Sequence, residues 1–228
     1  MRVSRQDLEH MIVYEDASVI VCHKCPYLAV ESANVRQQDL VSLLKNRRLS
    51  KREEPYIGVI HRIDQPVEGL IVFAKTRDAA AVLSKQLKEG EMSKDYLALV
   101  EKNGPLTSAH NLCHYIKKDE KSNQSVVVEE GTAGAKPARL SFQVLEERAR
   151  AYLLAIQLDT GRHHQIRVQF AALGHPLLGD EKYGAKPLNG QPLALCANHL
   201  SFVHPGSKKR MDFEIEPKND LFISTKEL

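Results

Sequence analysis

Short β-rich runs joined by turns, with few helical stretches between them, are the feature that most restricts how this chain folds. The first such runs span residues 12–14, 19–24, 58–60 and 70–74. A doubly wound fold requires strands and helices to alternate along the chain, and that alternation is missing here. The pattern therefore predicts an α+β fold built on a mixed sheet.

Later parts of the chain continue the same pattern. We expect further strands over residues 96–100, 139–145, 151–158, 192–203 and 211–215. Apolar residues at helical spacing predict helices over 78–88 and 164–173. Asp39 is expected to cap a helix of about two turns at residues 40–44. Residues 107–134 are polar and poorly periodic, so we interpret them as a variable excursion.

The composition is that of a globular protein. The chain has 228 residues, of which 43% are hydrophobic, and no apolar run approaches the about 20 residues of a membrane span. The first residues mix charges with apolar side chains, unlike a signal peptide. We therefore expect a single domain over residues 1–228, a cytoplasmic location and no association with a membrane.

Four cysteines do not form a disulfide framework in a cytosolic chain of this length. They are Cys22, Cys25, Cys113 and Cys196. Cys22 and Cys25 have the spacing of a metal or redox pair, but a structural zinc site needs four ligands and no second such pair exists. An extended segment, not a helix, follows the pair at Pro26. The sequence thus predicts no metal site.

Positive charge is concentrated in one segment, although the formal net charge of the chain is only +3. Residues 45–52 hold five basic side chains and no acidic one. Such a segment is consistent with a solvated loop face and equally with a surface that attracts phosphate groups. Arg47 and Arg48 are the candidates for phosphate contacts in this loop.

Asp64 lies in a loop between two β-rich runs, beside Arg62 and ahead of Gly69. Catalytic residues are often found on loops that a rigid scaffold holds in place. The alternative is a structural aspartate that hydrogen-bonds to the backbone of its own turn, and residue type alone favours this alternative over a catalytic role. Tyr96 opens a later strand, where a tyrosine is more often part of a core than of a site.

Basic side chains gather where the helix over 164–173 is expected to begin. After Gly161, four of the next six residues are Arg or His, although the positive end of a helix dipole favours acidic residues. A local sequence that goes against the preference of the helix dipole is expected at functional sites. The alternative interpretation is an ordinary basic turn that faces solvent. His163 and His164 point in different directions on a helix and form no i, i+4 pair, which argues against zinc.

Four segments, in this order, resemble the motifs of the RluA family of pseudouridine synthases. HRIDQPVEGLIVFAK resembles H-R-L-D-x-x-T-S-G-L-x-x-F-A-K, and KDYLALV resembles K-x-Y-x-A-x-V. TGRHHQIRVQFAALGHPLLGDEKYG resembles T-G-R-T-H-Q-I-R-x-H-L-x-x-x-G-H-P-I-x-G-D-x-x-Y-G, and LCANHLSFVHP resembles L-H-A-x-x-L-x-F-x-H-P. The resemblance covers about residues 12–217, and four ordered motifs are a specific signal.

The resemblance implies an enzyme that isomerises a specific uridine to pseudouridine in structured RNA, either ribosomal or transfer RNA, without a cofactor or metal. It implies a mixed, mainly antiparallel sheet in two lobes, with a central catalytic cleft and flanking helices. Asp64 matches the family's essential aspartate, Tyr96 the tyrosine near the target uracil, and Arg167 the arginine that pairs with the aspartate. Arg62 matches the residue that fills the stack left by the flipped nucleotide, and Leu195 matches an apolar wall of the pocket.

Physical chemistry makes these implied roles reasonable. The base must leave the RNA stack, and a planar guanidinium such as Arg62 can offset part of that cost by stacking. Asp64 must be ionised to attack the sugar or to take a proton from it, and the sequence leaves both routes open. Burial raises the pKa of a carboxyl group, whereas a nearby cation such as Arg167 lowers it.

Three departures from the family motifs affect these expectations. Residues 66–68 replace x-T-S, and Glu68 adds a negative charge that is expected to raise the pKa of Asp64 or to repel phosphate. Tyr27 stands where the family's N-K-P-x-G-L segment has glycine, so that turn is expected to differ. Gln169 and Cys196 stand where histidines are common.

Many family members carry an S4-type RNA-binding domain ahead of the catalytic domain, and Asp64 lies too near the start for one. RNA binding is therefore expected from the catalytic domain itself, in a protein that we expect to be a monomer. The expected RNA contacts are His61, Arg62, Lys75, Arg162, His164, Gln165, Leu195, Arg47 and Arg48.

Two alternatives stand beside the synthase. One is an RNA-binding module that has lost catalysis, which the changes at residues 66–68 motivate and an Asp64→Ala comparison separates. The other is a metal-dependent hydrolase or nuclease. It needs a cluster of ligands that the spacing of His and Asp residues does not supply, and loss of activity on chelation would favour it.

Overall fold

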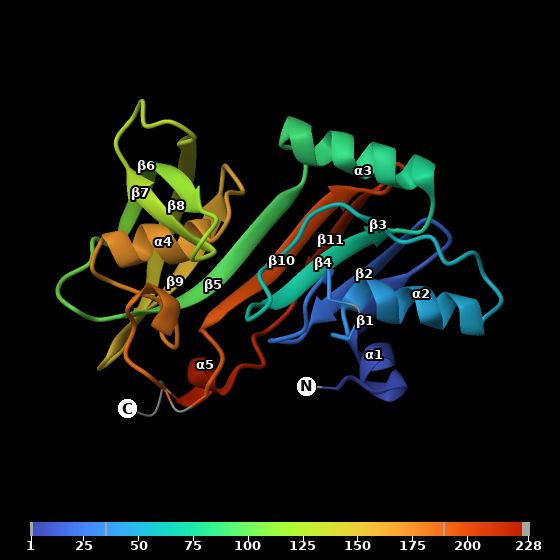
Figure 1. The fold of residues 1–228 in the computed structure, drawn as a ribbon, viewed down its shortest axis with the longest axis horizontal. Helices are drawn as coiled ribbons and strands as arrows, with labels where there is room; N and C mark the ends of the chain where they lie inside the picture. Colours follow the sequence, from blue (N-terminus) through green and yellow to red (C-terminus); the bar gives the residue numbers. More distant parts are fainter. Residues whose placement is uncertain (1, 35, 189, 225–228) are drawn as a thin grey trace. The chain divides into compact units, whose positions relative to one another are not determined.

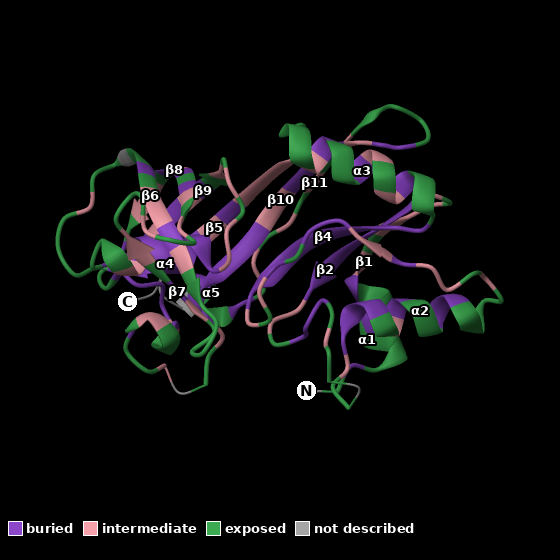
Figure 2. Ribbon diagram, turned by 45° about the horizontal axis from the view of Figure 1, so that its top comes forward, coloured by how far each residue is buried: buried purple, intermediate pink, exposed green. Residues whose placement is uncertain are grey.

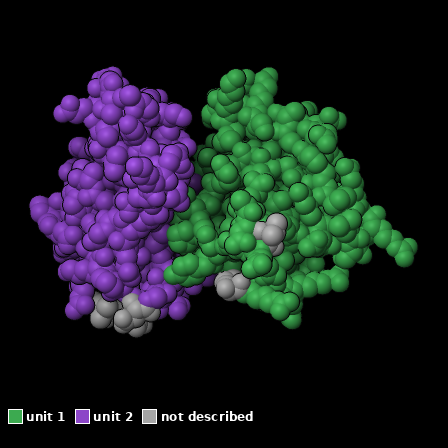
Figure 3. Space-filling view, viewed as in Figure 1, with its two compact units in different colours: residues 1–94, 197–216 green, residues 95–196, 217–228 purple. Residues whose placement is uncertain are grey.

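The computed structural model describes residues 2–34, 36–188 and 190–224, and the chain divides into two compact units (Figure 3). Unit 1 comprises residues 1–94 and 197–216, and unit 2 comprises residues 95–196 and 217–228. Each unit combines antiparallel strand pairs with a few helices (Figure 1). The predicted α+β class with a mainly antiparallel sheet is therefore confirmed.

Unit 1 consists of strands with helices packed against them. Its strands are β1 (Ile12–Glu15), β2 (Val19–Lys24), β3 (Gly58–Val59), β4 (Glu68–Ala74), most of β10 (Leu195–Val203), and β11 (Arg210–Glu214). They run in the order β1-β2-β4-β10, with β11 beside β10 and β3 beside β4. Its helices are α1 (Arg5–Met11), α2 (Leu40–Ser50) and α3 (Arg77–Glu89). Helix α1 contacts β1, β2 and α2, whereas α3 contacts β3 and β4.

The two strands β2 and β4 form the centre of unit 1. Every residue of both strands is buried (Figure 2), and the apolar stretches over residues 19–22 and 70–74 account for most of them. Helix α3 packs against this part of the sheet. Thr76 caps its first turn, and Gly90 ends it in a left-handed conformation. Leu83 of α3 is fully buried in the same core cluster as Val72 and Phe202.

Gly69 is a position in β4 at which a neighbouring strand lies very close. Its φ is +138°, a conformation that side chains disfavour. A Cβ atom at this position would lie 2.5 Å from the backbone nitrogen of Ala197 in β10. The glycine that follows the Asp64 loop is therefore required by the packing of the strand behind that loop.

We expect Gly69→Ala to lower the free energy of unfolding by roughly 2–4 kcal/mol, because overpacking and a strained φ add together. Urea unfolding followed by far-ultraviolet circular dichroism measures this change. Gly104→Ala is the matched control, since Gly104 has a φ of +141° but nothing within 4 Å of its Cβ position. If the two variants lose the same free energy of unfolding, then the strained φ, and not the close approach of Ala197, causes most of the loss.

Unit 2 is a second set of antiparallel strands. Its strands are β5 (Ser93–Glu101, all but the first two residues), β6 (Ala109–Asp119), β7 (Gln124–Val128), β8 (Lys136–Glu147) and β9 (Ala151–Leu158). They run in the order β5-β9-β8-β6-β7. Helix α4 (Gln165–Ala172) contacts β6 and β7. A 3-10 turn, η1 (Glu181–Tyr183), and a short helix, α5 (Asp220–Ser224), complete the unit.

The prediction of an irregular excursion over residues 107–134 is wrong. This stretch contains β6 and β7, which pair from Tyr115 with Val128 to Asp119 with Gln124. Strand β7 ends the strand order, so only one of its edges is paired within the sheet. An exposed edge hairpin buries little apolar surface, and its sequence therefore lacks the strong alternation of an internal strand.

The prediction of a basic loop after a two-turn helix is also wrong. Helix α2 begins at the predicted cap, where Asp39 accepts a hydrogen bond from the Ser42 N–H at 2.8 Å, but it continues to Ser50. Arg47 and Arg48 thus lie on the last turns of a helix, where cations interact favourably with the helix dipole.

Candidate active site

The loop that carries Asp64 is held in unit 1 by apolar side chains. Ile63 and Val67 are buried at 6% and 2% exposure, whereas Arg62 is exposed and Asp64 is partly exposed. The Val67 N–H donates a hydrogen bond to the Asp64 carbonyl at 3.0 Å and closes a short turn. This anchoring leaves the side chains of Arg62 and Asp64 accessible on a fixed backbone.

A buried cation lies beneath this loop. Lys24 is fully buried, and its Nζ donates to the carbonyl oxygens of Cys25, Leu28 and Gln65 at 2.9, 2.8 and 3.1 Å. Burial lowers the pKa of Lys24 to about 8, while attraction to Cys25, Asp64 and Glu68 acts in the opposite direction. Lys24 therefore ties the turn after β2 to the Asp64 loop and keeps a positive charge within reach of Asp64.

Sequence reasoning did not assign Lys24 to the site. The signal was present, because a lysine two residues after the apolar run VIVC is unusual at the end of a β-rich run that is expected to be buried. The segment HKCPYL was noted only for its cysteine spacing and its missing glycine. All four cysteines are unbridged. Within the described ranges, no cluster of three or more His, Cys, Asp or Glu side chains is arranged to hold a metal ion.

The turn after β2 contains a residue in a left-handed conformation. Tyr27 has a φ of +65°, which is a conformation that glycine adopts readily. Tyr27 is also the position at which the family motif has glycine.

Glu68 does not stand on the surface. It is 2% exposed, and its carboxylate lies 3.5 Å from the Nε2 atom of His23. A carboxylate enclosed in this way is not placed to repel an approaching phosphate. The departure at residues 66–68 is therefore accommodated inside unit 1.

Arg167 has a carboxylate partner that the sequence did not reveal. It is 4% exposed on α4, and its Nε and Nη2 atoms donate to the two carboxylate oxygens of Asp180, each at 2.7 Å. Asp180 is 2% exposed, and the guanidinium also lies 5.1 Å from the centre of the Tyr183 ring. Asp180 and Tyr183 belong to the segment GDEKYG, which marked the family without suggesting roles for these two residues.

The residues before α4 are fixed by neutral contacts. His164 has a φ of +53° and stacks on His163 with ring centres 3.7 Å apart. Its Nδ1 atom lies 2.8 Å from the Tyr183 hydroxyl oxygen. Burial, assisted by Arg167, lowers the pKa of His164 to about 2, so this ring is neutral at physiological pH. His164 therefore carries no positive charge that could attract an RNA phosphate.

Gln165 and Arg162 organise the same turn through backbone groups. The Gln165 side chain donates to the Arg139 carbonyl at 3.0 Å and accepts from the Arg162 N–H at 3.0 Å. Arg162 donates through Nε to the Pro137 carbonyl at 2.9 Å and stays partly exposed. Of these two predicted RNA contacts, only Arg162 thus retains accessible surface for one.

The two remaining predicted site residues in unit 2 are buried on strands. Tyr96 of β5 is 7% exposed and pairs across the sheet with Ile156. Leu195 is 4% exposed at the start of β10. Both positions suit a core side chain as well as the wall of a pocket.

Three predicted phosphate contacts in unit 1 are held by ion pairs or carbonyl groups. Arg47 is 7% exposed and donates to Glu9 and Glu15, each at 2.8 Å. Lys75 also binds Glu15, with its Nζ 2.8 Å from the carboxylate. Arg48 is 6% exposed and donates to the Glu54 carbonyl. These contacts give each cation a structural role.

His61 is buried and neutral. The Val72 N–H donates to its Nε2 atom at 3.4 Å, which requires that nitrogen to be unprotonated. Burial, together with the charge of Lys94, lowers the pKa of His61 from 6.5 to about 3. This histidine, predicted as an RNA contact, thus serves to hold the loop against β4.

We expect acid to destabilise unit 1 through His61. In the unfolded chain His61 binds a proton below about pH 6.5, whereas in the folded protein it stays neutral down to about pH 3. The free energy of unfolding therefore falls as the pH decreases through this window. The limiting slope is about 1.4 kcal/mol per pH unit for one such group. Urea midpoints between pH 7 and pH 5.5 measure it. His61→Gln should flatten the slope, and His10→Gln, at an exposed position, should leave it unchanged.

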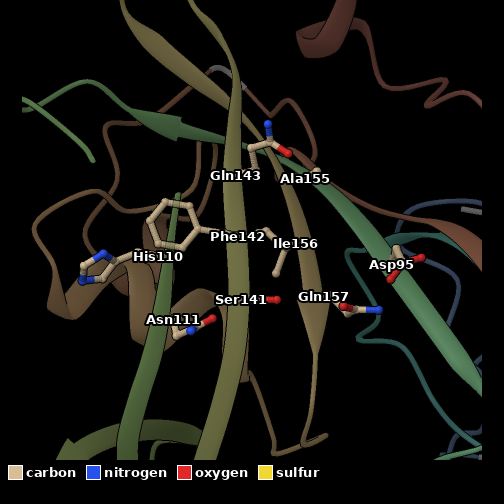
Figure 4. A pocket seen from close by; sticks show the side chains of 9 residues that line it. All are labelled: Asp95, His110, Asn111, Ser141, Phe142, Gln143, Ala155, Ile156 and Gln157. Carbon is tan, nitrogen blue, oxygen red and sulfur yellow. The ribbon is translucent and has the colours of Figure 1, made fainter. Parts of the chain in front are cut away.

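Unit 2 also contains an open hollow of about 620 Å³ (Figure 4). Its lining is largely amide, hydroxyl and carboxylate side chains from β5, β6, β8 and β9. The lining residues are Asp95, His110, Asn111, Ser141, Phe142, Gln143, Ala155, Ile156 and Gln157. The predicted site residues are not among them.

Comparisons with known proteins identify the family to which the sequence and the fold are similar. The sequence model of the family described as RNA pseudouridylate synthase matches residues 18–172. Ribosomal large subunit pseudouridine synthase D of Zymomonas mobilis is 31% identical over 98% of this chain and 74% of its own length. The synthase D of Nitrosomonas europaea is 36% identical over 92% of the chain and 62% of its own. The synthase C of Vibrio cholerae is 30% identical over 90% and 65%.

The chain thus spans about two thirds of the length of these bacterial relatives. The solved structure of human RNA pseudouridylate synthase domain containing 4 matches the fold with a TM-score of 0.77 and 23% identity, covering 97% of this chain and 93% of its own. No helix in the described part of the chain is both long and apolar enough to cross a membrane. The matched residues and the ordered motifs lead to one conclusion: the chain belongs to the RNA pseudouridylate synthase family.

Proposed function

We propose that this protein converts a uridine of large-subunit ribosomal RNA to pseudouridine, with Asp64 as the acting carboxylate. The observation that carries the proposal is the placement of Asp64, partly exposed in a loop whose neighbours Ile63 and Val67 are buried. Catalytic groups need this combination of accessibility and a fixed backbone. The names of the bacterial relatives support large-subunit ribosomal RNA as the substrate.

The reaction breaks the N1–C1′ bond of the uridine and forms a C5–C1′ bond, while a proton leaves C5 and another is gained at N1. The carboxylate of Asp64 either attacks C1′ or takes a proton from the sugar, and both routes require it to be ionised. Lys24 lies beneath the loop, interacts electrostatically with Asp64 and donates a hydrogen bond to the Gln65 carbonyl. In this scheme Lys24 positions the Asp64 loop without touching the substrate.

The remaining roles follow from the family resemblance. We propose that Arg62, whose side chain is exposed, enters the stack that the flipped base vacates. Tyr96 is proposed to remove the C5 proton, and Arg167 to favour the charged form of Asp64. Leu195 is proposed as an apolar wall for the uracil.

RNA binding is proposed to rely on side chains that remain accessible. Arg62 and Arg162 meet this condition, whereas Arg47, Arg48 and Lys75 are already held by carboxylate or carbonyl groups. We further propose that the protein acts as a monomer in the cytoplasm, where its RNA substrate is made. Transfer RNA is a second candidate substrate, and the mapping experiment described next examines it as well.

Carbodiimide treatment followed by reverse transcription maps pseudouridine in RNA and tests the proposal. Large-subunit ribosomal RNA and transfer RNA transcripts are each incubated with the protein. We expect one new stop in the ribosomal transcript and none in transfer RNA. New stops in transfer RNA alone would overturn the choice of substrate. Salt-sensitive binding to ribosomal RNA without any stop would favour the catalytically silent binder.

A further inference from the structure

Glu68 is a buried acidic residue for which the proposed chemistry has no use. It begins β4 with 2% of its surface exposed, and its carboxylate lies 3.5 Å from the Nε2 atom of His23, which is 8% exposed. A buried carboxylate is unfavourable unless an opposite charge lies close to it. Lys24, at the end of the neighbouring strand β2, provides such a charge.

Lys24 and Glu68 lie on adjacent antiparallel strands. Lys24 is paired in register with Gly69, the residue that follows Glu68. Burial lowers the pKa of Lys24 to about 8. Attraction to Cys25, Asp64 and Glu68 opposes this effect. Because Lys24 has no exposed surface, salt and water do little to screen these attractions. Glu68 therefore favours the protonated form of Lys24 from inside the core.

The hydrogen bonds of Lys24 require its charged form. Its Nζ atom donates to the carbonyl oxygens of Cys25, Leu28 and Gln65 at 2.9, 2.8 and 3.1 Å. An ammonium group has three N–H bonds, one for each of these acceptors. A neutral amine has only two, and its lone pair would face the third carbonyl oxygen. The longest of the three contacts, to Gln65, is the one that joins Lys24 to the loop of Asp64, and we expect loss of the proton to release it.

The charge on Lys24 does not serve the stability of the fold. Burial lowers its pKa from 10.5 to about 8, so the folded protein binds this proton more weakly than the unfolded chain does. Between these two pH values the free energy of unfolding consequently rises with pH. A charge that is unfavourable for folding, yet bound by three carbonyl groups, points to a role in holding the loop.

We propose that Glu68 is a positioning residue for the Asp64 loop. Its buried negative charge keeps Lys24 protonated, and the ammonium group holds the loop through the Gln65 carbonyl. The inference rests on the proposed function, because the position of the loop matters for the carboxylate of Asp64. Glu68 is enclosed in the core, so it acts through Lys24 and not by contact with RNA. The departure from x-T-S at this position is then part of the support of the loop and no sign of lost catalysis.

The pH dependence of kcat tests the proposal, with a large-subunit ribosomal RNA transcript at saturating concentration. In wild type, kcat should fall above about pH 8, as Lys24 loses its proton. In Glu68→Gln the fall should begin roughly 1 pH unit lower, the smaller end of the effect of one close opposite charge. KM should change little, because no RNA contact is removed. Glu68→Asp, which keeps the charge, should restore the wild-type profile.

Titration of Lys24 by nuclear magnetic resonance observes the same proton without the reaction. The side-chain carbon next to the amine should titrate roughly 1 pH unit lower in Glu68→Gln than in wild type. In wild type, the backbone amide signals of Gln65 and Val67 should shift with the midpoint of Lys24, since the loop follows the proton. This second part uses wild type alone, so it applies even if Glu68→Gln does not fold.

The control is Glu31→Gln, which removes an exposed carboxylate from unit 1 and should keep the wild-type profile. An equal shift of the profile in this variant would contradict the proposal, because net charge alone would then be responsible. Identical kcat profiles or identical Lys24 midpoints in wild type and Glu68→Gln would overturn it, as would loop signals in wild type that do not change as Lys24 titrates. If wild type forms no pseudouridine while the Lys24 midpoint shifts and the loop signals follow it, the proposed function fails and the support of the loop by Glu68 stands.

Discussion

Replacing Asp64 by asparagine is expected to lower kcat for pseudouridine formation by about a thousandfold or more while RNA affinity stays near that of wild type. Asparagine has the same shape as aspartate but can neither attack a sugar carbon nor accept a proton, and removal of such a group typically costs 10²–10⁴-fold. The backbone of the loop should remain in place because buried neighbours anchor it. Chromatography of nucleosides after complete digestion of the RNA measures the product.

The control for this experiment is Asp78→Asn, which neutralises an exposed carboxylate at the start of α3 in the same unit. It should leave both kcat and affinity unchanged. Activity of Asp64→Asn within about tenfold of wild type would remove Asp64 from the chemical step, since even a modest acid–base role exceeds that factor. A parallel loss of affinity would instead indicate that Asp64 mainly shapes the loop.

Removing Asp180 is expected to produce the largest loss of stability. Asp180→Ala leaves the buried guanidinium of Arg167 without the carboxylate that binds it twice at 2.7 Å. Breaking one side of a buried ion pair costs about 3–5 kcal/mol, because a charge stays in a medium of low dielectric constant. The chain has no tryptophan, so urea unfolding followed by circular dichroism is the suitable measurement.

An exposed ion pair provides the comparison. The side chain of Asp212 is 65% exposed and lies 3.0 Å from His199. Asp212→Ala should cost no more than about 1 kcal/mol, as for other surface pairs. If Asp180→Ala costs as little as Asp212→Ala, then Arg167 is stabilised mainly by other contacts. Asp180→Asn, which keeps the shape and part of the hydrogen bonding, should fall between the two.

Asp180 adds a partner to the electrostatic description of Arg167. The family resemblance implies an arginine that pairs with the essential aspartate and does not mention Asp180. In the structure the Asp180 carboxylate binds the Arg167 guanidinium. Inside unit 1, the charge of Lys24 interacts with Asp64.

The parts of the fold that were predicted correctly are those with strong apolar patterns. Strands β2 and β4 each contain a continuous apolar run, at residues 19–22 and 70–74, and helix α3 has a regular apolar face with clear capping residues. Strand β7 and the end of α2 were missed for the opposite reason. Strand β7 has one edge outside the sheet pairing, and α2 ends in basic residues whose acidic partners, Glu9 and Glu15, are distant in sequence.

In the candidate site, the ordered motifs singled out Asp64, Tyr96 and Arg167 as candidates, because residue type and spacing are visible in the sequence. The roles of Lys24 and Asp180 were not visible, since they depend on which carbonyl or guanidinium group the fold brings beside them. The exposure of Tyr27 and its left-handed φ are likewise properties of the folded turn.

The most direct test of the central claim is release of tritium from large-subunit ribosomal RNA labelled at C5 of uridine, with wild type and Asp64→Asn compared in one experiment. Formation of the C5–C1′ bond expels the label, so release reports the isomerisation itself. Release by wild type and none by Asp64→Asn is the predicted result. Equal release by the two proteins would contradict the assignment of Asp64, and no release by wild type from RNA that it binds would contradict the proposed activity.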